Sequence, residues 1–135
     1  MLFDRLLRPV AVRAHCDLPC GVYDPAQARI EAQSVKAIIE KYHGSDDEAF
    51  KSRALIIKEE RSDLVKHHLW VLWTDYFKPP HFAKYPQLHE LFNTATKLAG
   101  GGGGTKASVD VSVADELLAK IDEIAVIFAE TKAAA

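Results

Sequence analysis

Four segments of the chain place apolar residues three and four positions apart, the spacing that forms one face of an α-helix. The first segment begins at Pro25, with Asp24 as its N-cap, and ends before Gly44. The second begins after Asp47, in an acidic stretch that suits a helix N-terminus, and extends to about Tyr76. The positions expected to face inward in these two helices are Ala28, Ile30, Val35, Ile38, Ile39 and Tyr42, then Phe50, Ala54, Ile57, Leu64, Val65, His68, Leu72 and Trp73.

Two further helices are predicted in the second half of the chain. Residues 78–80 predict an extended connection, because the residue before each proline avoids the helical region. A third helix begins near Pro86, and the five consecutive glycines at 100–104 predict a flexible loop before the fourth. The inward positions are Leu88, Leu91, Phe92, Ala95 and Leu98, then Val113, Leu117, Ile121, Ile124 and Phe128. No segment alternates as a β-strand does, so we expect an all-α fold, an antiparallel four-helix bundle.

Composition is consistent with a single domain and excludes some function classes. A chain of 135 residues with 48% hydrophobic content can bury roughly two-thirds of its unfolded surface. The net charge of −2 argues against a nucleic-acid-binding protein, which is usually basic. No apolar run approaches the ~18 residues that span a bilayer, so no membrane association is expected. With only two cysteines, a cytoplasmic setting with reduced thiols is expected.

The first residues of the chain, 1–14, are basic through Arg5, Arg8 and Arg13. A secretory signal would show an apolar centre of about 7–15 residues, and here arginine and proline interrupt each apolar run. Composition alone favours an ordinary N-terminal segment over a pro-peptide.

The stretch from His15 to Asp24 carries the candidate chemistry of the chain. It contains both cysteines, Cys16 and Cys20, and one of the six histidines. Pro19 and the glycine at 21 predict an irregular hook instead of a helix. Two thiols and an imidazole this close together can bind one metal ion, but they fall short of a closed structural zinc site. Taken alone, the short pattern favours an incidental or redox-active pair of cysteines.

The longer run HCDLPCGVYDPAQARIEA resembles the N-terminal nickel hook of nickel-containing superoxide dismutases. Further matching stretches are KHH at 66–68, LWTDYFKPPHF at 72–82 and KYP at 84–86. The resemblance covers about residues 15–98, and the five-glycine loop is unlike the family. It implies an oxidoreductase that converts superoxide to dioxygen and hydrogen peroxide while nickel alternates between Ni(II) and Ni(III).

The resemblance also implies the ligands of one nickel ion per subunit. Cys16 and Cys20 would supply thiolates, Cys16 its backbone nitrogen, and His15 its α-amine and, in the oxidised state, its imidazole. Nitrogen and sulfur donors suit square-planar Ni(II). An α-amine exists at His15 only after a processing peptidase has cut the Ala14–His15 bond. Residues 1–14 would then be a leader, and residues 15–135 the mature domain.

Other residues match positions that surround the metal in the family. Glu31 and Arg61 would hold the imidazole of His15, because a ligand histidine commonly needs its second nitrogen fixed. Tyr23 would limit access to the metal, Tyr76 would be a second nearby tyrosine, and Asp17 would tie the hook to the scaffold. From the residues alone, these are an ordinary surface ion pair, half-buried tyrosines and a solvated turn acid.

The lysines, histidines and exposed aromatic residues allow further expectations. Lys78 and Lys84 are candidates for attracting superoxide, which is an anion. His67 and His68 point about 100° apart on a helix, and His43, His81 and His89 show no ligand spacing, so none of these five is expected to bind nickel. The family forms homohexamers, for which the aromatic residues Phe50, Trp70, Phe77 and Phe82 could supply an interface.

Two other functions are compatible with the hook. One is a nickel- or copper-binding delivery protein, which would hold the metal without turnover. The other is a thiol redox switch, in which Cys16 and Cys20 form a reversible disulfide without metal.

Overall fold

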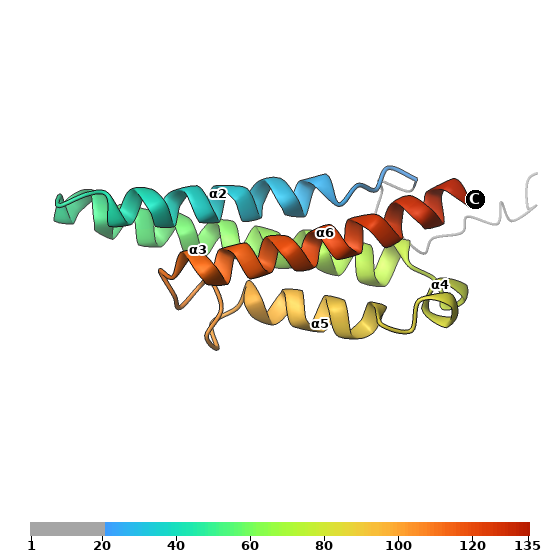
Figure 1. Cartoon of the computed structure of the whole chain (residues 1–135). Helices are drawn as coiled ribbons and strands as arrows, with labels where there is room; N and C mark the ends of the chain where they lie inside the picture. Colours follow the sequence, from blue (N-terminus) through green and yellow to red (C-terminus); the bar gives the residue numbers. More distant parts are fainter. Residues whose placement is uncertain (1–20) are drawn as a thin grey trace, which may run out of the picture.

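The computed structural model describes residues 21–135, and these residues form helices without any strand (Figure 1). His15, Cys16, Asp17 and Cys20 lie outside the described residues, as does the segment 1–14. The elements are α2 (Ala26–His43), α3 (Glu48–Val71), the π-helical turn η1 (Leu72–Tyr76), α4 (Pro79–Lys84), α5 (Leu88–Leu98) and α6 (Val111–Ala133).

The four long helices form an antiparallel bundle, which confirms the expected fold class. α2 packs against α3 and α6, and α5 packs against α6 and α3, so the four helices close into a ring. Figure 1 shows the chain running along the bundle and back twice, with the start of α2, the short α4 and the C-terminus all at one end. None of the helices in this part of the chain is long and apolar enough to cross a membrane.

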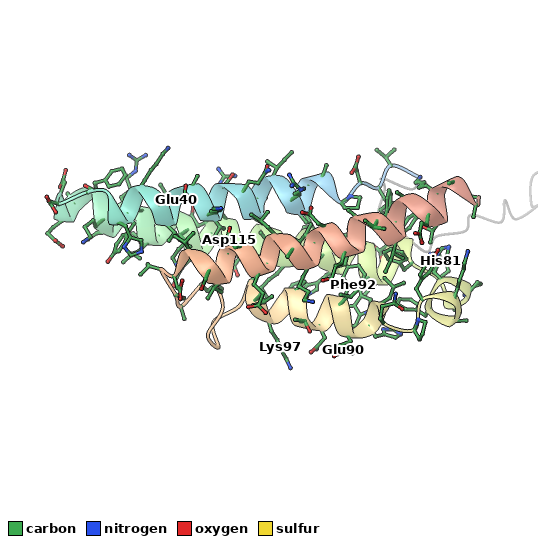
Figure 2. All side chains as sticks on the ribbon, in the orientation of Figure 1. Glu40, His81, Glu90, Phe92, Lys97 and Asp115 are labelled. Carbon is green, nitrogen blue, oxygen red and sulfur yellow. The ribbon has the colours of Figure 1, made fainter. Side chains whose placement is uncertain are left out.

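The core lies between the four long helices and consists mainly of aliphatic residues with Phe77, Phe92 and Phe128. Figure 2 shows the side chains of Glu90 and Lys97 on the outer side of α5, away from that core. Most of the inward positions expected from the sequence are buried. Ile30 is an error, because 59% of its surface is exposed.

The inward face of α3 differs from the expected one. Its buried residues are Ala54, Lys58, Ser62, Val65 and Leu69. Phe50 and Leu64, which were expected inside, are 39% and 38% exposed. Two polar residues therefore occupy core positions on α3, and a hydrophobic pattern alone selects the neighbouring apolar positions instead.

The helix starts follow the capping residues of the sequence. Asp24 Oδ1 accepts a hydrogen bond from the Ala26 N–H at 2.9 Å, as an N-cap does, although the regular helix begins one residue after Pro25. Asp47 caps α3 in the same way and accepts from Ala49 at 3.0 Å. Gly44 follows the last residue of α2, as expected.

The connection after α3 is not simply extended, as the prolines predicted. Lys78 is extended, with φ −115° and ψ 165°, but α4 begins at the next residue. Pro79 and Pro80 occupy the first two positions of α4, where a backbone N–H has no helical partner and its loss costs little. His81 Nδ1 accepts the Lys78 N–H at 2.9 Å and fixes the start of this helix.

The five-glycine loop is anchored to α3 at its far end. The ammonium of Lys58, which is 2% exposed, donates to the carbonyls of Thr105 and Lys106. The Ser62 and Thr105 hydroxyls lie 2.8 Å apart. At Gly104 a Cβ atom would lie 2.6 Å from the carbonyl oxygens of Leu98 and Gly100 and closer still to that of Lys97, so only glycine fits there. The buried polar residues of α3 thus hold the loop that joins α5 to α6.

Candidate metal centre

The described chain begins beside Tyr23, whose ring packs against that of Tyr76. The two ring centroids are 5.6 Å apart, with an angle of 57° between the planes. Tyr23 lies three residues after Cys20 in the sequence. The tyrosine pair therefore lies where the described chain follows the hook in sequence.

Tyr76 is the last residue of the π-helical turn, and aromatic rings enclose it. Its ring centroid lies 4.5 Å from that of Phe128, 4.9 Å from that of Phe77 and 5.8 Å from that of His81. The π-helical turn closes with a 3.0 Å hydrogen bond from the Phe77 N–H to the Leu72 carbonyl. The wider turn and the ring contacts together fix the position of the Tyr76 phenol.

Glu31 and Arg61 meet across α2 and α3, as expected from the sequence. Arg61 Nη1 lies 3.2 Å from Glu31 Oε1 and 3.1 Å from Oε2. The Glu31 side chain is 15% exposed and that of Arg61 is 45% exposed, so the carboxylate is the more enclosed partner. Only one guanidinium nitrogen is used, which leaves the carboxylate capacity to accept another hydrogen bond.

His68 lies on α3 two turns after Arg61, close enough to Glu31 for their charges to interact. Burial lowers the pKa of His68, and the neighbouring His67 lowers it further, while the Glu31 carboxylate partly opposes both effects. The two larger effects both favour the neutral imidazole of His68.

The two lysines expected to attract superoxide lie in different settings. Lys78 Nζ donates to the Asp75 carbonyl at 2.6 Å, next to Tyr76 in the chain. Lys84 Nζ lies 5.4 Å from the centroid of the Tyr85 ring instead. Of the two, Lys78 is the one beside the tyrosine pair.

The histidines of the described chain have structural partners and form no metal site. His43 Nε2 contacts the Val109 carbonyl at 2.5 Å, and His89 Nδ1 accepts the Trp73 indole N–H at 3.0 Å. Residues 21–135 contain no group of three or more histidine, cysteine or acidic side chains that could hold a metal ion.

The donor set of the hook fits nickel. Two thiols, an imidazole and backbone nitrogen occur within residues 15–20, and thiolate sulfur with nitrogen suits square-planar Ni(II). The structure brings together Tyr23 with Tyr76 and Glu31 with Arg61. Sequence reasoning missed Thr131 and Lys132, which contact Tyr76 from α6. A threonine and a lysine at a helix end give no signal of such a role.

A helical bundle preceded by a cysteine–histidine hook defines a class of small α-helical metalloenzymes. A sequence model of nickel-containing superoxide dismutase matches residues 10–132. Superoxide dismutase [Ni] of Streptomyces coelicolor is 56% identical over 134 residues, which cover 98% of this chain and 100% of that protein. The corresponding protein of Streptomyces seoulensis is 58% identical over 134 residues, and the match again covers 98% of this chain and 100% of that protein.

The solved structures agree with the sequence comparisons. A native nickel superoxide dismutase structure is 58% identical, with a TM-score of 0.82, and the match covers 87% of this chain and 98% of that one. The chain belongs to the nickel-containing superoxide dismutase family.

Proposed function

We propose that residues 15–20 of this superoxide dismutase hold one nickel ion, with His15, Cys16 and Cys20 as ligands. The observation that supports the assignment is the contact of Tyr23, three residues after Cys20 in the sequence, with Tyr76, which Thr131 of α6 also contacts. Nickel supplies one-electron redox chemistry for the disproportionation of superoxide.

The ligand set requires a processed chain. Residues 1–14 are a leader that a peptidase removes by cutting the Ala14–His15 bond, and residues 15–135 are the mature domain. Before the cut, the His15 nitrogen is an amide and a poor donor. A reducing compartment such as the cytoplasm keeps Cys16 and Cys20 as thiols until the metal binds.

The residues around the hook position its groups. Glu31, fixed by Arg61, accepts a hydrogen bond from the second ring nitrogen of His15 and so orients the imidazole. Tyr23 and Tyr76 together limit access and order water or hydrogen peroxide. Asp17 ties the hook to the scaffold. Lys78, beside Tyr76, attracts the anionic substrate.

The chain assembles as a homohexamer. Phe50 and Trp70, 39% and 43% exposed, support an interface on α3. Phe77 was expected to contribute, but it is 3% exposed and belongs to the core of the subunit.

The experiment compares uncut full-length protein with protein that begins at His15, both refolded with nickel. N-terminal sequencing, nickel content and superoxide turnover are measured on the same samples. We expect turnover only in the trimmed form. Activity in protein with an intact Met1 would refute the α-amine ligand. Nickel binding without turnover in the trimmed form would favour a delivery protein, and a metal-free disulfide would favour a redox switch.

A further inference from the structure

The last turn of α6 reaches Tyr76 through Thr131. This threonine is 6% exposed, and its Oγ1 lies 2.8 Å from the Tyr76 hydroxyl oxygen and 2.8 Å from the Phe128 carbonyl oxygen. Tyr76 belongs to the tyrosine pair described above, and Thr131 lies 55 residues away in sequence.

The two contacts of Thr131 determine which way the Tyr76 proton points. A carbonyl oxygen can only accept, so the single hydroxyl proton of Thr131 is donated to Phe128. The contact with Tyr76 then requires the phenol O–H to donate to Thr131 Oγ1. The Tyr76 oxygen retains its lone pairs, so toward any other molecule it acts as a hydrogen-bond acceptor.

The surroundings of Tyr76 would otherwise favour a bound anion. Lys132 Nζ lies 5.7 Å from the centroid of the Tyr76 ring and 5.8 Å from that of Phe128. No carboxylate of the described chain lies within ion-pair distance of Lys132. A phenol O–H that is not donated within the protein, together with an ammonium over the same ring, is a good donor set for a small anion.

We propose that Thr131 is a positioning residue that keeps the Tyr76 phenol from retaining small anions, superoxide included. Because the phenol proton is held by Thr131, superoxide attracted by Lys132 passes the tyrosine pair instead of binding there. Water or hydrogen peroxide, which can donate, binds to the phenol oxygen instead. The inference rests on the proposed position of Tyr23 and Tyr76 beside the metal.

The test measures azide binding to metal-free, full-length protein, by NMR of labelled tyrosine. Thr131→Val keeps the shape of the side chain and removes the acceptor, so the phenol O–H becomes available. We expect azide to bind about tenfold more tightly to this variant than to the unmodified chain, because a hydrogen bond to a charged group is strong. Thr131→Ser restores the acceptor and should bind azide as the unmodified chain does.

Two further variants keep the test decisive. The gain in azide affinity should vanish in the Thr131→Val, Tyr76→Phe double variant. Tyr76→Phe alone should leave azide affinity unchanged. This variant can be measured even if Thr131→Val does not fold. Equal affinity of folded Thr131→Val and the unmodified chain would overturn the inference, as would loss of azide binding in Tyr76→Phe. These measurements need neither nickel nor turnover. A negative result would therefore refute the role of Thr131 without refuting the proposed metal site.

Discussion

Arg61 Nη1 contacts both carboxylate oxygens of Glu31, at 3.1 and 3.2 Å, and so joins α3 to α2 on the side of the bundle where His68 lies. The partners are separated by 30 residues in sequence. An ion pair of this exposure contributes little to stability. The contact of Arg61 with both oxygens instead fixes the direction of the Glu31 carboxylate.

Replacing Arg61 by alanine should reduce superoxide turnover much more than stability. We expect turnover per chain to fall about tenfold, because residues that orient metal ligands typically have effects of this size or larger. The free energy of unfolding should change by less than about 1 kcal/mol. Both are measured on nickel-loaded, trimmed protein, by stopped-flow assay and urea titration.

Arg29→Ala provides a matched control. Arg29 is similarly exposed and forms an ion pair with Asp122 at 2.8 Å, joining α2 to α6. This variant should keep full turnover. Equal losses in Arg29→Ala and Arg61→Ala would mean that Arg61 acts only as part of the scaffold.

The glycine loop allows a sharp prediction about stability. Gly104→Ala should lower the free energy of unfolding by about 1–3 kcal/mol, because the new methyl group would meet three backbone carbonyl oxygens, two of them at 2.6 Å and that of Lys97 closer still. Gly102→Ala, which has open space around it, should be neutral or up to about 1 kcal/mol more stable. Urea titrations at one protein concentration decide the matter. An unchanged free energy of unfolding in Gly104→Ala would show that the carbonyl oxygens do not approach Gly104 as closely as the structure indicates.

Lys58 gives the stability of the fold a specific pH dependence. Burial lowers the pKa of the Lys58 ammonium, and the charge of Glu59 opposes this only in part. Between the lowered pKa of the folded state and the ordinary pKa of the unfolded state, the unfolded chain binds more protons. Stability from this group therefore rises with pH across that alkaline window. The free energy of unfolding of the Lys58→Met variant should be about 1–3 kcal/mol lower, because two carbonyls lose their hydrogen-bond donor.

The difference in stability between the unmodified chain and Lys58→Met should widen as the pH rises through this window. Lys106 serves as the comparison, because its hydrogen bond with Asp63 raises the pKa of its ammonium. The contribution of Lys106 is fully present below the unfolded pKa and is lost above it, so the Lys106→Met difference should stay constant through the Lys58 window and narrow at higher pH. A Lys58→Met difference that narrows in the same way would contradict the burial of this ammonium.

The bundle itself follows from the sequence because apolar spacing and capping residues are local signals. Asp24, Asp47 and Gly44 mark helix ends through contacts within a few residues. Lys58 could not be assigned to the core in this way, because the carbonyls that satisfy it lie 47 and 48 residues further along. The helix α4 was missed because Pro79 and Pro80 exclude only the interior of a helix and fit its first turn.

The candidate site was predictable only in part, for a similar reason. Glu31, Arg61, Tyr23 and Tyr76 were identified through family resemblance, and the structure pairs them as expected. Thr131 was not, since its proposed role depends on accepting the Tyr76 proton while donating its own proton to the Phe128 carbonyl on its own helix. Such a relationship exists only once α6 has packed against the π-helical turn.

The most direct test of the central claim is the decay of superoxide in the presence of trimmed chain, residues 15–135, loaded with one nickel per chain. We predict many turnovers per nickel, with a rate that approaches the diffusional ceiling of ~10⁹ M⁻¹s⁻¹, and loss of this activity in Cys16→Ser and Cys20→Ser. Decay at the spontaneous rate with the unmodified, nickel-loaded chain would contradict the assignment of residues 15–20 as the catalytic metal site.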